Sequence, residues 1–120
     1  MEWGTFNSGR WSSPPVKVAI SFLQQWKGLR PTANGLGVLI RGRSVHGFGM
    51  KESLHVVGLN AQRCVVGVRI LRPRHLVIVR GARHILELPI DGEPPLLGVV
   101  LTWEHGGPAD LVRNTHRKSE

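Results

Sequence analysis

The stretch RGRSVHGFGMKES, residues 41–53, brings together side chains that could bind a small ligand. The His46 imidazole can donate or accept a hydrogen bond and can coordinate a metal. Met50 offers a soft thioether and Lys51 a positive charge. These three residues are therefore candidates for lining a binding pocket.

The glycines of this stretch determine how its side chains are presented. Gly47 and Gly49 suit a bent or bulged strand better than a helix. We expect the bend to turn His46, Phe48 and Met50 toward one concave side. Phe48 and Met50 are predicted to belong to the core, and His46 to line the pocket.

A second candidate group lies in RGARHILELP, residues 80–89. In a strand, Glu87 points away from the face shared by its two leucine neighbours. A buried carboxylate needs a partner, and Arg80, Arg83 or His46 could supply one. Such a group either fixes strand register as an internal ion pair, the interpretation we favour, or acts as a perturbed acid in a pocket.

The predicted pocket combines both groups over an apolar floor. Its residues are His46, Met50, Lys51, Arg80, Arg83 and Glu87. This set suits a small anionic ligand or the carboxylate end of a peptide. The sequence predicts no cofactor for it.

Other chemistries have less support. His46, Met50, His55 and Cys64 are the residue types that bind copper or zinc, but they contain no closely spaced ligand pair. Ser44 and Cys64 lack a nucleophile elbow, and no glycine-rich phosphate loop occurs. A binding module is favoured over an enzyme, with a small hydrolase or metal-dependent enzyme as the alternative.

The charge is strongly positive, with 16 Lys and Arg against 8 Asp and Glu. No acidic residue occurs between Ser53 and Leu86, where the arginines are Arg63, Arg69, Arg72, Arg74, Arg80 and Arg83. Such a field attracts nucleic acid, acidic lipid or acidic proteins. Nucleic-acid binding through the 63–83 face is an alternative function. Aromatic residues are not interleaved with these arginines, which disfavours it, and a solvated strand face is the simpler interpretation.

The hydrophobic pattern predicts many short strands. They are expected at 16–20, 37–40, 54–59, 64–71, 76–79, 80–89 and 94–103, with residues 76–79 covered on both sides and one short helical turn beginning at Ser21. This spacing predicts a mainly β fold, a compact antiparallel sandwich or barrel.

The chain is expected to be one domain. Residues 1–15 are predicted to be a loose leader, residues 16–103 the β domain, and residues 104–120 a disordered basic tail. The single cysteine, and the lack of a secretory signal or a long apolar run, predict a cytoplasmic location without a membrane span. Oligomeric state cannot be predicted.

Several motifs of the sequence match a known family pattern in both residue type and spacing. They are Arg43, Val45, His46 and the Phe48-Gly49-Met50 triplet, then Arg72-Pro73, then residues 80–89. In these motifs the chain resembles the domain of unknown function 192 (DUF 192) family, in the form common among actinobacteria. The resemblance covers residues 16–103 and implies a small, jelly-roll-like β fold with no established activity.

Some positions depart from the family pattern. They are Gln25 in place of an arginine, Ser53 and His55 in place of proline and aspartate, Gly58 in place of a bulky aromatic residue, and Arg63 in place of the hairpin glycine. At that hairpin we expect Asn60 to take the positive φ. The departures indicate a divergent member.

Overall fold

A computed structural model of the protein describes residues 2–19, 32 and 35–106. Its strands are β1 (Trp3–Ser8), β2 (Trp11–Ser12), β3 (Val16–Ala19), β4 (Gly37–Arg41), β5 (Ser44–His46), β6 (Leu54–Leu59), β7 (Val65–Leu71), β8 (Leu76–Ile78), β9 (His84–Pro89) and β10 (Thr102–His105). The prediction of a mainly β fold is confirmed. The predicted helical turn lies outside the described residues. No helix in the described part is long and apolar enough to cross a membrane.

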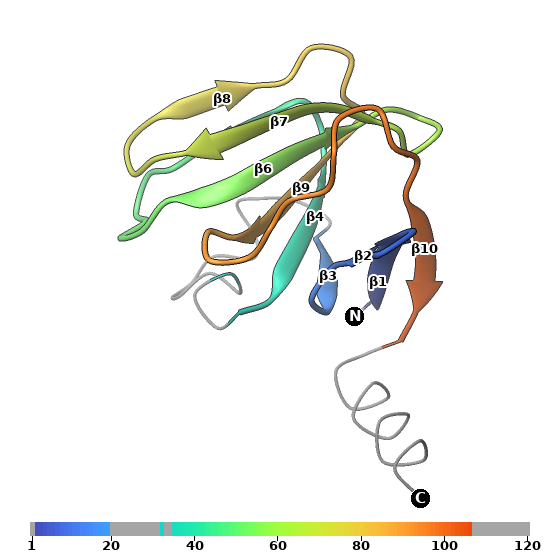
Figure 1. Ribbon diagram of the computed structural model, residues 1–120. Helices are drawn as coiled ribbons and strands as arrows, with labels where there is room; N and C mark the ends of the chain where they lie inside the picture. Colours follow the sequence, from blue (N-terminus) through green and yellow to red (C-terminus); the bar gives the residue numbers. More distant parts are fainter. Residues whose placement is uncertain (1, 20–31, 33–34, 107–120) are drawn as a thin grey trace, which may run out of the picture.

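Eight of the strands form one curled sheet, a half-barrel (Figure 1). Its order is β10-β1-β3-β4-β9-β6-β7, with β2 paired to β1. Neighbours are antiparallel except β3 and β4, which run parallel with Val16 opposite Gly37. The main sheet is therefore mixed, whereas the sequence predicts an antiparallel arrangement. Parallel neighbours cannot be joined by a tight hairpin, and residues 20–36 make the longer connection.

The N-terminal residues belong to this sheet. Sequence predicts a loose leader at 1–15, but β1 lies between β10 and β3 and pairs with both. Phe6 is only 2% exposed, and its ring centroid lies 4.7 Å from that of Trp103. The prediction is wrong for residues 3–12, because their core contacts come from β10, almost a hundred residues later in the chain.

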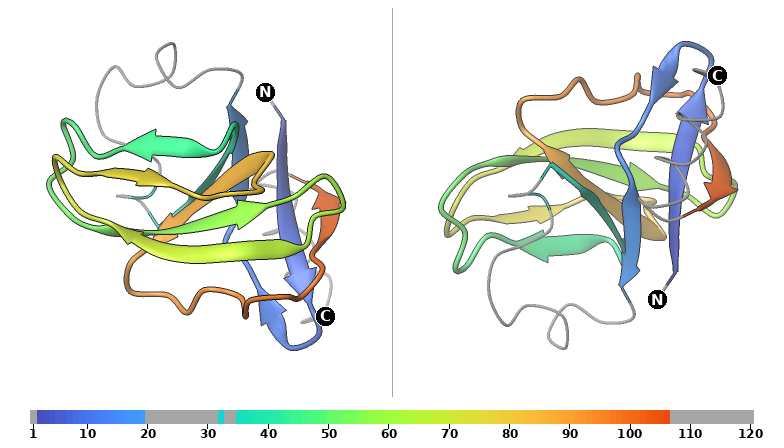
Figure 2. Two further views of the ribbon diagram at one scale, coloured as in Figure 1. Left: turned by 90° about the horizontal axis from the view of Figure 1, so that it is seen from above. Right: turned by 90° about the horizontal axis from the view of Figure 1, so that it is seen from below.

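The other two strands, β5 and β8, pair as a separate two-stranded sheet beside β7 (Figure 2). Val45 lies opposite Val77, and both pack on the core. Val79, just after β8, is 2% exposed and lies against Gly58 and Gly67. Val79 thus fills the space that a side chain at position 58 would occupy.

Two apolar clusters pack on opposite faces of the main sheet. One contains Val38, Val56 and Ile85, together with Val45 and Val79 from the β5–β8 layer. The other contains Phe6, Val57, Leu86 and Leu88. Successive residues of β9 therefore alternate between two buried faces, which is why HILELP is apolar on both sides except at Glu87.

Two predicted strands differ in the structure. Leu76 and Ile78 are 63% and 56% exposed, so β8 is covered on one face only. In the predicted strand at 94–103, regular pairing begins only at Thr102. Leu96 and Leu97 are exposed, and Gly98 has a φ of 90° that ends an extended run.

The β6–β7 hairpin adopts its positive φ at Arg63 (62°), and the prediction of Asn60 is wrong. Asn60 stabilises the turn in another way, because its Oδ1 accepts hydrogen bonds from the backbone N–H groups of Gln62 (3.0 Å) and Cys64 (2.9 Å). The asparagine side chain thus fixes a turn whose left-handed residue is an arginine.

Candidate anion-binding site

His46 ends β5, and the chain then reverses against the turn between β7 and β8. The Gly47 N–H donates to the His75 carbonyl (2.8 Å), and the Arg74 N–H donates to the Gly47 carbonyl (3.1 Å). A Cβ on Gly47 would collide with the carbonyl oxygen of Arg72. Gly47 is therefore required by this close approach of two backbones.

The predictions for Phe48 and Met50 have different outcomes. Met50 packs against the first core cluster, which confirms its predicted place. Phe48 is 65% exposed, so its assignment to the core is wrong. The Met50 N–H donates to the Gly47 carbonyl (3.2 Å), which closes a turn with Phe48 at its tip. The ring of Phe48 lies against that of His46, with 5.1 Å between centroids.

Glu87 is completely buried in β9. It lies opposite Val38 on β4 and Val56 on β6, so it shares the face of the first cluster. Beyond these two neighbours, Val38 lies opposite Lys17 on β3 and Val56 lies opposite Arg69 on β7. Lys17 and Arg69 are therefore each two strands away from Glu87.

His46 and Glu87 come from different layers. Val45 points to the core, so strand alternation puts its neighbour His46 on the outer side of the β5–β8 sheet. Glu87 lies on the core-facing side of the main sheet. Lys51 is exposed beyond the His46 loop. The six predicted residues are thus placed in three locations, with Arg80 and Arg83 in the third.

Arg80 and Arg83 follow β8, at the end opposite to His46. Here two loops run side by side, because the Gly42 N–H donates to the Arg83 carbonyl (2.8 Å) and the Val79 N–H donates to the Arg43 carbonyl (2.8 Å). The next register pair is Arg41 with His84. We call the cationic set of these loops the basic corner: Arg41, Arg43, Arg80, Arg83 and His84.

Electrostatics in the basic corner are unfavourable for further positive charge. Burial lowers the pKa of His84, and the nearby guanidinium groups of Arg41 and Arg83 lower it further. Within residues 2–19, 32 and 35–106, no carboxylate forms an ion pair with any of the four arginines. The corner therefore has positive charge that an anion could neutralise.

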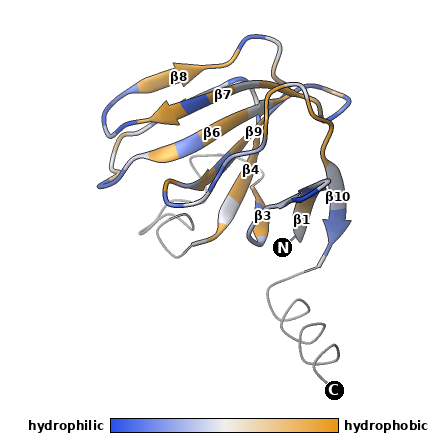
Figure 3. Ribbon diagram, viewed as in Figure 1, coloured by the Kyte–Doolittle hydropathy of each residue, from blue (hydrophilic) through white to orange (hydrophobic). Residues whose placement is uncertain are grey.

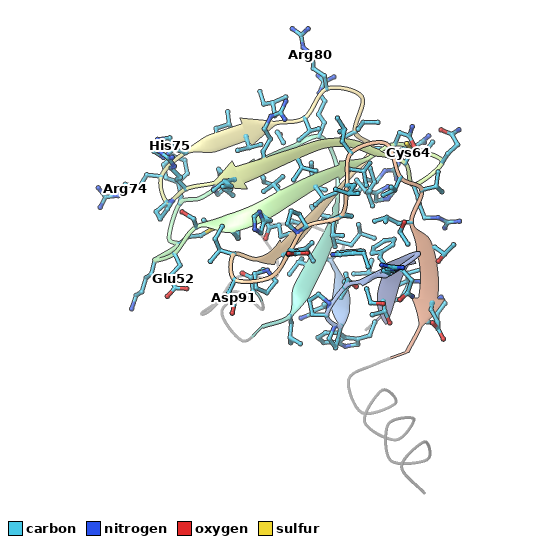
Figure 4. All side chains as sticks on the ribbon, viewed as in Figure 1. Glu52, Cys64, Arg74, His75, Arg80 and Asp91 are labelled. Carbon is cyan, nitrogen blue, oxygen red and sulfur yellow. The ribbon has the colours of Figure 1, made fainter. Side chains whose placement is uncertain are left out.

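The arginine-rich stretch does not form the single face that sequence predicts. Arg63 and Arg83 lie at one end of β7, since the Arg83 N–H donates to the Leu59 carbonyl at the β6–β7 hairpin (2.7 Å). Arg72 and Arg74 lie beyond the other end, about 20 Å away for a strand of this length. Figure 4 shows Arg74 and Arg80 projecting from different parts of the molecule.

Sequence analysis missed Arg41, Arg43 and His84. Their contribution depends on the pairing of β4 with β9, strands that are separated by more than forty residues. Only the two arginines that directly precede the SVHGFGM motif, Arg41 and Arg43, could have suggested it.

The described part of the chain holds no group of three His, Cys, Asp or Glu residues that could bind a metal ion. Of the predicted soft ligands, Cys64 is half-buried, and its Sγ lies 3.4 Å from the Gly98 carbonyl oxygen. His55 lies in β6, opposite Ile70 on one side and Leu88 on the other. His55 thus lies apart from the basic corner, and Cys64 belongs to the β6–β7 hairpin.

Comparison with curated proteins finds a homologue. The chain is 33% identical over 101 residues to a UPF0127 protein of Thermococcus sibiricus (strain DSM 12597 / MM 739). The match covers 74% of this chain and 66% of the relative, so the chain spans just under two thirds of the relative's length. No family model matches the sequence, and no solved structure matches the fold.

Proposed function

We infer that this chain belongs to the UPF0127 family, which is the same as DUF 192, and that it is a binding module for a small anionic ligand. The homologue in Thermococcus sibiricus supports the family, and its name states no activity. The motif at residues 43–50 and the stretch at 80–89 support an actinobacterial-type member. The single cysteine supports a cytoplasmic location, because the chain does not depend on an oxidising compartment.

The observation that carries the proposed function is the basic corner. Two loops joined by backbone hydrogen bonds present four arginines, and the described residues provide no carboxylate partner for them. Holding like charges together is unfavourable unless an anion is available. A ligand that carries phosphate or carboxylate groups would remove this repulsion.

The chemistry of arginine favours such a ligand. A guanidinium presents a planar set of donors that can bind two oxygens of one phosphate or carboxylate. Arg41 and Arg83 both lie close enough to His84 to lower its pKa. An anion between them would be contacted from β4 and from the loop before β9.

The proposed site retains part of the predicted pocket. Arg80 and Arg83 stay in the proposal as ligand-binding residues. Glu87 is assigned a structural role, because it is completely buried within the sheet. His46 belongs to the β5–β8 sheet, Met50 packs against the first core cluster, and Lys51 is exposed beyond the His46 loop.

The test uses tripolyphosphate as the probe and the full chain as the protein. Calorimetric titration measures the affinity, and NMR measures the pKa of the His84 imidazole. Bound anion should raise that pKa, because negative charge favours the imidazolium form. The paired variant Arg41→Gln with Arg83→Gln should lose about tenfold or more in affinity, since each charge-assisted hydrogen bond contributes about 1.5–3 kcal/mol.

The matched control is Arg69→Gln with Arg72→Gln, which removes the same charge elsewhere on the protein. This control should bind tripolyphosphate within about threefold of the parent, as expected for long-range screening alone. Equal losses in both variants would mean that net charge, and not the basic corner, attracts the anion. Tight binding of single-stranded DNA, weakened equally by both variants, would support the nucleic-acid alternative instead.

A further inference from the structure

A second surface, distinct from the basic corner, is the outer face of the β5–β8 sheet. We define this outer face by Ser44, His46, Phe48, Leu76 and Ile78. In register, His46 lies opposite Leu76 and Ser44 lies opposite Ile78. Phe48 extends the face through its ring contact with His46. The members are thus neighbours on one surface, although they come from two segments of the chain.

The outer face is unusually apolar for an exposed surface. Phe48, Leu76 and Ile78 are 65%, 63% and 56% exposed. Figure 1 shows β8 as the outermost strand of its layer, and Figure 3 shows that it is hydrophobic. Large apolar side chains grouped on an exposed face commonly mark a binding surface.

Positive charge borders this face at both ends. Arg72 and Arg74, with His75, form the turn before β8, and Arg80 follows β8 at the other end. All four side chains are exposed. Figure 4 shows Arg74 and His75 at one tip, and Arg80 pointing outward from the layer.

Negative charge is almost absent from the segments that build the face. Between residues 41 and 86 the only carboxylate is Glu52. In Figure 4 it points away from β8, on the side of the molecule opposite to Arg80. The face therefore combines an apolar centre with a cationic border that no acid of residues 53–86 neutralises.

We propose that the outer face of β5–β8 docks onto an anionic lipid membrane surface. Phe48, Leu76 and Ile78 would enter the interfacial region, and the bordering arginines would meet the headgroups. This goes beyond the binding of a small anion at the basic corner.

The arrangement of charge and apolar surface favours a membrane over other occupants. A bilayer offers anionic headgroups beside an apolar interior across a plane, which matches cations at both ends of an apolar centre. A second copy of the chain docked face to face would bring arginine borders near one another. A nucleic acid would find on this face one phenylalanine, Phe48, beside the His46 imidazole, with no tryptophan or tyrosine among its five residues on which to stack a base.

The experiment measures binding of the full chain to phosphatidylcholine vesicles with and without phosphatidylglycerol, by flotation. The protein should bind only the vesicles that contain phosphatidylglycerol, and added salt should weaken binding. Leu76→Thr with Ile78→Thr should reduce the partition coefficient at least about tenfold, because exposed apolar area no longer enters the interface. Threonine keeps the strand propensity of β8, so the sheet should remain folded.

The matched control is Leu96→Thr with Leu97→Thr, which removes two leucines that are 75% and 68% exposed in another loop. It should bind vesicles like the parent. Arg72→Gln with Arg74→Gln should weaken binding by about fivefold per arginine. Circular dichroism of each variant should match that of the parent, which checks that the variant is folded.

The outcomes separate this proposal from the small-anion site. The Leu76 and Ile78 variant should still bind tripolyphosphate, whereas Arg41→Gln with Arg83→Gln should lose tripolyphosphate but keep most vesicle binding. Absence of binding to the anionic vesicles would overturn the proposal. So would equal loss in the Leu96 and Leu97 control, or a lipid-free dimer that the Leu76 and Ile78 variant abolishes.

Discussion

Gly58→Ala tests whether the packing of one valine, Val79, against β6 and β7 holds the β5–β8 layer on the main sheet. Gly58 and Gly67 lie opposite each other on β6 and β7. An ideal Cβ on Gly58 would lie 2.9 Å from the Val79 Cβ and 3.1 Å from the Ala82 Cβ. At Gly67 it would lie 2.5 Å from the Val79 Cγ1. Carbon atoms normally approach to about 3.5–4.0 Å, so the added methyl group does not fit.

Val79 has little freedom to move aside. It is 2% exposed, its N–H donates to the Arg43 carbonyl (2.8 Å), and its carbonyl accepts from the Ala82 N–H (3.3 Å). Overpacking of this kind costs about 1–3 kcal/mol. Replacing glycine by alanine also reduces the entropy of the unfolded chain, and this stabilises the folded state by about 0.4–1 kcal/mol. We expect a net loss of about 1–2 kcal/mol in the free energy of unfolding.

The measurement is urea unfolding of the parent, Gly58→Ala, Val79→Ala and the double variant. Val79→Ala alone should cost about 2 kcal/mol through lost burial and a cavity. In the double variant the new methyl group occupies that cavity, so the combined loss should fall short of the sum by about 1 kcal/mol or more. Gly92→Ala is the control, because its Cβ would lie 3.8 Å from the nearest atom. Additive losses, or a neutral Gly58→Ala, would refute the proposed packing.

Four further predictions follow from single positions. Gly47→Ala should destabilise the protein by about 1–3 kcal/mol and change the NMR shifts around Phe48, because its Cβ would meet backbone and not a flexible side chain. Arg63→Gly should raise the urea midpoint, with a gain of about 1 kcal/mol, since a φ of 62° is unfavourable for a residue with a Cβ. Glu87→Ala should lower the free energy of unfolding by about 2–4 kcal/mol, because a completely buried side chain and its polar interaction are lost. Because the pKa of His84 is lowered in the folded protein, the unfolded state binds the proton first as the pH falls. The free energy of unfolding should therefore decrease as the pH drops below 6.5. Urea midpoints measured across this pH range should depend less on pH in His84→Asn than in the parent.

Local patterns in the sequence were sufficient for the fold class. The strand patterns at residues 54–59 and 64–71, separated by the turn residues 60–63, predict the β6–β7 hairpin, and the structure confirms it. The same is true of HILELP, which becomes β9. These elements depend on strand propensity and on turns within a few residues, so their sequences contain the necessary information.

Pairing between distant segments could not be predicted in the same way. Trp3–Ser8 is polar enough to resemble a leader, and its place in the sheet depends on β10 and β3. Leu76 and Ile78 resemble a strand buried on both faces, yet nothing in the described part of the chain covers their outer side. A local pattern shows that a strand is apolar, but not which of its faces another layer will cover.

The candidate site shows the same division. The sequence by itself determined the mainly β class, the excess of arginine and the bend at Gly47, because these follow from composition and from local backbone preferences. Tertiary structure alone decided that Arg41 meets His84, that Arg72 and Arg80 lie at opposite ends of one layer, and that Glu87 is buried. Charged side chains act through space, so their function depends on strand pairings that join residues far apart in the chain.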